Sequence, residues 1–146
     1  QTDPYDVLKA LKVMETSDDP THTLVKGVRK GRALSDNVFT MGMSLFCSLV
    51  LRAPLWDINA QPNLIPRELF TKYQDPPYDF SFDLYYYFMA LRDGFKIVRV
   101  DVAFPQRLHG VSSWNINWTS KVRFIKRTVD FTLKLRGKVR SNTSSR

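Results

Sequence analysis

The residues best suited to chemistry in this 146-residue chain lie between positions 79 and 115. Asp83 follows Ser81, a residue type that caps helices, so its carboxylate falls in a first helical turn beside exposed backbone N–H groups. Such a carboxylate can act as a general base, or it can do no more than stabilise its helix. A polar loop follows further on and carries Arg107, His109, Ser112 and Trp114.

A second charged group accompanies residues 24–28, which are short and β-prone. Lys26 lies inside this segment, and Arg29 and Arg32 follow in a basic, glycine-bearing turn. Because Arg forks bind phosphate oxygens through two hydrogen bonds, the turn is a reasonable cradle for a diphosphate. A basic turn of this kind can also be simply solvated.

A third polar group interrupts residues 56–64, which alternate loosely like a short strand. Asp57, Asn59 and Gln61 stand there between apolar neighbours. Polar groups in a strand are costly to bury unless they form hydrogen bonds. The pattern therefore favours a cleft wall or a solvent-facing edge about equally.

The remaining sequence predicts the elements that position these groups, and their alternation is typical of an α/β layered domain. They are a helix capped by Asp3 and ending near Glu15, an apolar helix over residues 38–51 capped by Ser35, a helical turn at 66–70, a helix from Ser81 to Gly94, a strand over 95–104, and an amphipathic helix over about 116–138.

Composition narrows the class of protein. Hydrophobic residues at 43% and charged residues at 25% are ordinary for a globular chain, but the net charge of +8 indicates a polyanionic partner or a solubilising surface. Cys47 is alone and lies in an apolar run, which predicts a small buried hydrophobe. That run of 14 residues is shorter than the ~20 that a bilayer span requires, so we expect a buried or interfacial helix.

The last helix carries one apolar stripe, broadened by Phe124, Phe131 and Leu135, with a basic cluster on the opposite side. Such a helix can lie in a membrane interface or cap a protein core. Residues 141–146 are predicted to form a flexible polar tail. The stripe is Trp118, Val122, Ile125, Val129 and Leu133, and the basic cluster is Arg123, Lys126, Arg127 and Lys134.

From residue 1 to about 136, these motifs resemble the second half of a family 2 glycosyltransferase, most of all the dolichyl- and polyprenyl-phosphate sugar transferases. The resemblance implies part of a GT-A, Rossmann-like mixed sheet with flanking helices, lacking the nucleotide-binding half. Residues 1–115 would form the acceptor side of that domain, followed by the basic helix at 116–140. Gln1-Thr2-Asp3-Pro4 resembles the residues just after the family's D-x-D motif. Gln1 thereby inherits a metal-ligand role toward Mg²⁺ or Mn²⁺, whose main acidic ligands would lie outside this chain.

The resemblance also assigns roles to the three polar groups. Asp83 takes the place of the acid on the acceptor-side helix, the candidate general base. Ser113 stands where lysine is usual, which removes one cation from the phosphate-binding segment. Donor phosphates would meet Lys26, Arg29, Arg32, Arg107 and Ser112, and the acceptor cleft would contain Asp57, Asn59, Gln61, His109 and Trp114.

The implied function is inverting sugar transfer from a nucleotide-sugar to a lipid-phosphate or glycan acceptor, at the cytoplasmic face of a membrane. We expect no nucleic-acid partner. The 146-residue chain alone is expected to be incomplete for activity, and an oligomer or another partner would be one way to complete the sheet. Two alternatives stay open: a basic non-catalytic module that binds an anionic membrane or nucleic acid, and an inactive domain derived from the GT-A fold.

Overall fold

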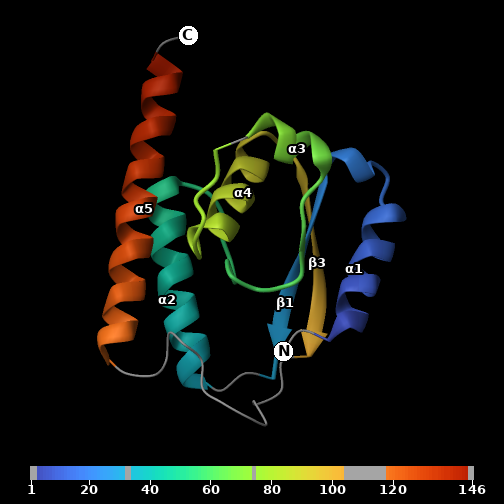
Figure 1. Cartoon of the computed structure of the whole chain (residues 1–146), viewed down its shortest axis with the longest axis horizontal. Helices are drawn as coiled ribbons and strands as arrows, with labels where there is room; N and C mark the ends of the chain where they lie inside the picture. Colours follow the sequence, from blue (N-terminus) through green and yellow to red (C-terminus); the bar gives the residue numbers. More distant parts are fainter. Residues whose placement is uncertain (1–2, 32–33, 74, 104–117, 145–146) are drawn as a thin grey trace.

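A computed structural model describes residues 3–31, 34–73, 75–103 and 118–144. Its helices and strands alternate along the chain, as the sequence predicts (Figure 1). In chain order they are α1 (Pro4–Glu15), the 3-10 helix η1 (Pro20–His22), β1 (Thr23–Lys30), α2 (Leu34–Leu51), β2 (Asn63–Leu64), α3 (Arg67–Lys72), α4 (Ser81–Arg92), β3 (Lys96–Ala103) and α5 (Trp118–Ser144).

The strands form a three-stranded mixed sheet in the order β2-β1-β3. β1 pairs in parallel with β3 along its whole length, from Thr23 opposite Lys96 to Lys30 opposite Ala103. It pairs antiparallel with β2, where Lys26 lies opposite Asn63. The prediction of an α/β domain is therefore confirmed at the level of a small mixed sheet with flanking helices.

One face of the sheet is covered by α1. Its start is as predicted, because Asp3 Oδ1 accepts a hydrogen bond of 2.9 Å from the backbone N–H of Tyr5. Ala10 is fully buried against Val25 of β1 and Val100 of β3. Val98 of β3 packs against the same cluster. The predicted strand over 95–104 is confirmed from Lys96 to Ala103, and Phe104 lies outside the described residues.

The other face of the sheet carries α4, and the pair α2 and α5 packs beyond it (Figure 1). α4 is buried on most sides, as its apolar sequence predicts. α2 and α5 run in parallel: the ring centroids of Phe39 and Phe124 are 6.0 Å apart, and Cys47 Sγ lies 3.5 Å from Thr132 Oγ1. Cys47 is buried, as predicted.

Two predictions about local structure are wrong. Residues 56–62 form turns rather than a strand, because Asp57 has a left-handed φ of 45° and its carbonyl accepts from Ala60 N–H at 3.0 Å. Arg29 lies inside β1, not in a turn after it, since the pairing with β3 continues to Lys30. The turn begins only at Gly31, which has a φ of +78°.

Helix ends also differ from the prediction. Ser81 is the first residue of α4 and not its cap, and its N–H donates to Asp79 Oδ1 at 2.9 Å. Ser35 likewise lies within α2. The last helix continues to Ser144, so it includes residues that the sequence assigned to a tail.

α5 contacts the core through the residues that were predicted to broaden its stripe, including Phe124 and Leu135. The predicted stripe itself is largely exposed: Val122 is 57%, Ile125 37% and Leu133 51% accessible. The helix therefore caps the core with one face and presents a second apolar face outward.

Candidate functional site

Asp83 lies in the first turn of α4, as predicted, at the point where this helix meets β2. Its Oδ1 accepts a hydrogen bond of 2.8 Å from the Asn63 side-chain amide, and its Oδ2 accepts one of 3.0 Å from the Gln61 side-chain amide. The carboxylate is thereby fixed in orientation by two donors from the same loop. Each oxygen can still accept a further hydrogen bond.

Burial raises the pKa of Asp83 above its ordinary value. The positive charge of Lys26 and the two amide hydrogen bonds oppose this rise. A carboxylate whose pKa is raised holds a proton more strongly, which brings it closer to the range in which a general base works near neutral pH.

Lys26 lies beneath this carboxylate network and is 1% exposed. Its Nζ donates to the carbonyls of Ile58 and Ala60 and, at 3.0 Å, to Asn63 Oδ1, and it lies 5.2 Å from the ring centre of Tyr87. Burial lowers the pKa of Lys26 to about 8, although the nearby carboxylates oppose the shift. Because its three N–H groups point at protein acceptors, Lys26 holds residues 58–63 in place, and its contact with a phosphate stays a prediction.

Arg29 and Asp57 form a second buried pair at the same loop. Arg29 donates from its backbone N–H to Asp57 Oδ2 at 3.0 Å, and from Nε and Nη2 to Asp57 Oδ1. The pair ties the start of the loop to β1 and balances the Arg29 charge within the protein. The predicted roles of Arg29 at a phosphate and Asp57 in an acceptor cleft are neither supported nor excluded by this pairing.

Gly27 explains how the loop approaches β1 so closely. Its N–H donates to the carbonyl of Pro62 at 2.8 Å. A Cβ at this position would overlap the carbonyl of Gln61, so only glycine fits here without a shift of the loop.

Asn59 contributes an acceptor that the protein leaves unused. Its Oδ1 is buried, and no group among the described residues donates a hydrogen bond to it. A buried acceptor without a donor costs about 1–3 kcal/mol, so such a group needs an explanation. Because this oxygen is closed off from solvent, a water or a ligand hydroxyl could reach it only after a movement of the loop.

The structure also brings in residues that the sequence analysis missed. Asn63 links Lys26 to Asp83, and it continues the every-second-residue pattern of Asp57, Asn59 and Gln61, which was the signal that could have revealed it. Arg99 of β3 donates to the Tyr87 hydroxyl and to the Trp56 carbonyl, and no spacing in the sequence indicates either contact.

Of the predicted site residues, the structure brings Lys26, Arg29, Asp57, Asn59, Gln61 and Asp83 to one loop and the strand and helix beside it. The others lie outside the described residues, so they have no place in this geometry. They are Gln1, Arg32, Arg107, His109, Ser112 and Trp114.

Two features that bear on function are absent from the described residues. Across residues 3–31, 34–73, 75–103 and 118–144, no three His, Cys, Asp or Glu side chains are grouped so that they could hold a metal ion. None of the helices in that part of the chain is both long and apolar enough to cross a membrane.

Comparison of the chain with protein-family models, with curated proteins and with solved structures gave no match. The fold and the site therefore define a class only: an α/β domain with a carboxylate held by two amides above a buried lysine.

Proposed function

We propose that this chain is the acceptor side of a GT-A-type inverting glycosyltransferase, which moves a sugar from a nucleotide-sugar to a lipid-phosphate or glycan acceptor. One observation supports this most: the Asp83 carboxylate is fixed by Gln61 and Asn63 at the open end of a buried helix. A rigidly held carboxylate with a raised pKa suits proton abstraction from an acceptor hydroxyl.

With a glycan acceptor, Asp83 takes the proton of the attacking hydroxyl. The hydroxyl oxygen forms a bond to the anomeric carbon of the sugar, and the bond from that carbon to the diphosphate breaks with both electrons leaving on the diphosphate. Attack from the side opposite the leaving group inverts the anomeric configuration.

With a lipid-phosphate acceptor, the nucleophile is already an anion and requires no base. In that case Asp83 only orients Gln61 and Asn63. The role of this residue therefore depends on the acceptor, which gives the proposal a test.

The donor diphosphate lies, in this proposal, toward Arg29 and the predicted partners Arg32, Arg107 and Ser112. Lys26 acts there through its charge alone, because its N–H groups hold the loop. The divalent metal that the resemblance implies finds no group of ligands among the described residues, so we assign it no step on this chain. The proposed location is the cytoplasmic face of a membrane.

The test uses the complete gene product and follows the transfer of radiolabelled sugar from a panel of nucleotide-sugars. Each donor is offered to a glycan acceptor and to a polyprenyl phosphate. For the glycan acceptor we expect Asp83→Asn to lower kcat by about 10²–10⁴, the usual contribution of a general base. For the lipid phosphate we expect a much smaller change in kcat.

The matched control is Asp101→Asn, since Asp101 lies on β3 with its side chain 66% exposed and should leave transfer unchanged. Absence of transfer from every donor to both acceptors would overturn the proposal. Equal loss in Asp101→Asn would show that the effect of Asp83→Asn is not specific to the site.

A further inference from the structure

From residue 38 onward, the exposed side of α2 is apolar. Val38, Met41, Leu45 and Leu49 recur at spacings of three or four residues, so they share one face of the helix. Their exposed fractions are 69%, 47%, 60% and 70%. Residues 38–51 contain no charged side chain, which is unusual for a helix that faces solvent.

α5 adds a second set of exposed apolar residues, Val122, Ile125 and Leu133, at intervals of three and eight residues. The buried residues of the two helices, such as Cys47 and Leu135, belong to the core. α2 and α5 lie side by side at the edge of the molecule farthest from α1 (Figure 1). Each exposed stripe lies apart from the buried residues of its own helix, which pack on the core. We call these seven residues of α2 and α5 the outer face.

Positive charge accompanies the outer face. α5 carries eight Lys and Arg residues against a single acid, Asp130. Lys126 follows Val122 by four residues and therefore borders the apolar stripe. Arg136 and Arg140 follow Leu133 by three and seven residues and continue its line along the helix.

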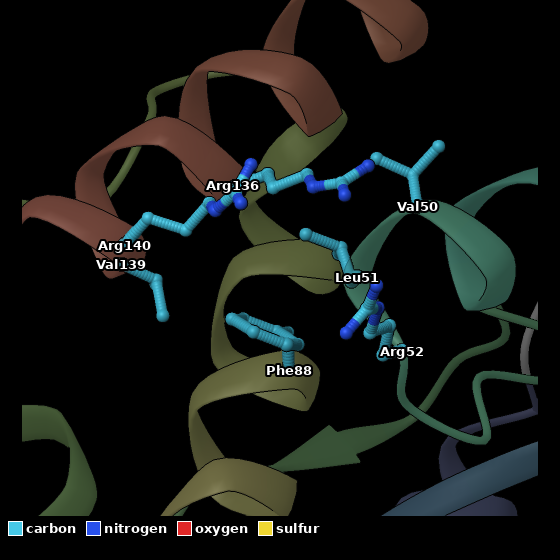
Figure 2. Close-up of a pocket in the computed structure, with 7 residues that line it drawn as sticks. All are labelled: Val50, Leu51, Arg52, Phe88, Arg136, Val139 and Arg140. Carbon is cyan, nitrogen blue, oxygen red and sulfur yellow. The ribbon is translucent and has the colours of Figure 1, made fainter. Parts of the chain in front are cut away.

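At the end of this line, arginines surround a pocket of about 140 Å³. Figure 2 shows Arg52, Arg136 and Arg140 around the apolar groups of Leu51, Phe88 and Val139. None of the seven residues that line this pocket in the described part of the chain carries a carboxylate. Guanidinium groups over an apolar floor match the phosphate of an amphiphile, because the charge and the adjoining chain each meet a complementary surface.

We propose that the outer face lies on an anionic lipid bilayer and that a lipid phosphate occupies the pocket formed by Arg52, Arg136 and Arg140. The apolar side chains enter the acyl boundary, and the neighbouring cations meet the headgroups. This inference does not depend on sugar transfer, since it uses only α2, α5 and the pocket that they form with Arg52 and with Phe88 of α4.

A second copy of the chain is a poorer occupant of the same surface. Two outer faces packed together would oppose two strongly basic α5 helices, and like charges placed together cost free energy. A bilayer with anionic lipids supplies both the apolar layer and the opposite charge.

The test is sedimentation of the 146-residue chain with vesicles of phosphatidylcholine, with and without phosphatidylserine. We expect binding to the mixed vesicles, little binding to the neutral ones, and loss of binding at high salt. Leu45→Gln with Leu49→Gln should weaken binding about tenfold or more, because two buried leucines contribute several kcal/mol to insertion. Arg136→Gln with Arg140→Gln should weaken binding to a similar degree.

The matched controls lie on α1, at the other side of the molecule. Leu8→Gln changes a leucine that is 62% exposed, and Lys12→Gln removes an exposed cation, so both should bind as the parent chain does. Circular dichroism of every variant separates lost binding from lost folding.

Three results would overturn the proposal. The first is equal binding to neutral and anionic vesicles, and the second is equal loss of binding in the α1 controls. The third is dimerisation in sedimentation velocity that Leu45→Gln with Leu49→Gln abolishes, which would make a second copy the occupant. Inorganic phosphate distinguishes a site for free anions: if it displaces the chain from vesicles at constant ionic strength, the pocket is a general phosphate site, not a lipid site.

Discussion

Two regions depart from ordinary protein structure in opposite ways. One is the loop at residues 56–62, with the strand and helix beside it that carry Lys26 and Asp83, and the other is the outer face of α2 and α5. In the loop and in the strand beside it, charged groups such as Asp57 and Lys26 are buried. On the outer face, leucines such as Leu45 and Leu49 are mostly exposed. Folded proteins commonly avoid buried charge and contiguous exposed apolar surface, because each carries a cost in free energy.

The two regions differ in what offsets these free-energy costs. The buried charges are paired within the chain: Asp57 with Arg29, and Lys26 with carbonyls and Asn63. The described residues provide no such compensation for the outer face, and the proposed lipid bilayer would provide it. We therefore expect mutations in the loop to change folding stability, and mutations on the outer face to change association.

Among changes at and beside the loop, the largest effect on stability is expected for Lys26→Met. The change leaves the carbonyls of Ile58 and Ala60 without their donor, which should lower the free energy of unfolding by about 3 kcal/mol at pH 7. Lys12→Met, at an exposed position, is the control and should change stability little. Urea unfolding of both variants measures the difference.

The same lysine makes a prediction about pH. Its pKa is about 8 in the folded chain and near 10.5 when unfolded, so the unfolded chain binds the proton more tightly. Stability should rise as pH increases from about 8 toward 10.5, by on the order of 3 kcal/mol, and Lys26→Met should lack this rise. If the stability of the parent chain and of the variant changed with pH in the same way, the prediction of a buried Lys26 with a lowered pKa would be wrong.

A smaller loss is expected for Gly27→Ala. The added methyl group overlaps the Gln61 carbonyl, and overpacking of this kind costs about 1–3 kcal/mol. Gly137→Ala is the matched control: its Cβ meets no atom, and alanine in a helix should raise stability by about 0.5–1 kcal/mol. Thermal unfolding of the pair should therefore show shifts of opposite sign.

The loop and the outer face also show what the sequence could predict. Asp83 in a first helical turn followed from local signals, since capping and helix dipoles act over a few residues. The turns at 56–62 did not, because the left-handed backbone of Asp57 is fixed by distant Arg29. Alternating polar residues identified side chains that the fold brings together, but they predicted the wrong secondary structure.

For α5, periodicity identified apolar residues but not which of them are buried. Phe124 and Val122 fit the same broad stripe in the sequence, yet only Phe124 contacts the core. The choice depends on how α2 and α4 approach the helix, which is a tertiary property. The sequence did not predict the pocket near Arg52 either, since Arg52 is far along the chain from the other two arginines, Arg136 and Arg140.

Asp83→Asn should have a modest effect on stability. It should raise the free energy of unfolding, whereas Lys26→Met and Gly27→Ala should lower it. The folded chain holds the proton of Asp83 more tightly than the unfolded chain, so the residue costs stability as pH rises through its raised pKa. We expect the variant to be more stable than the parent at pH 7, and the difference to shrink as pH falls and the Asp83 carboxylate takes up its proton. A clear loss of stability in urea unfolding would instead make the carboxylate a structural member of the loop.

The smallest effect is expected for Leu45→Gln. Its side chain is 60% exposed and glutamine is a good helix former, so stability should change by less than about 0.5 kcal/mol. Leu51→Ala, one helical turn and a half further along α2, removes a core side chain and should cost about 2–5 kcal/mol. If Leu45→Gln lowered the free energy of unfolding as much as Leu51→Ala, the outer face would be needed for folding. No partner would then be required to explain why it is apolar. A small cost in stability, combined with lost vesicle binding, would mean that folding does not require leucine at these positions. The physical reason for the exposed leucines would then be their contact with an external surface.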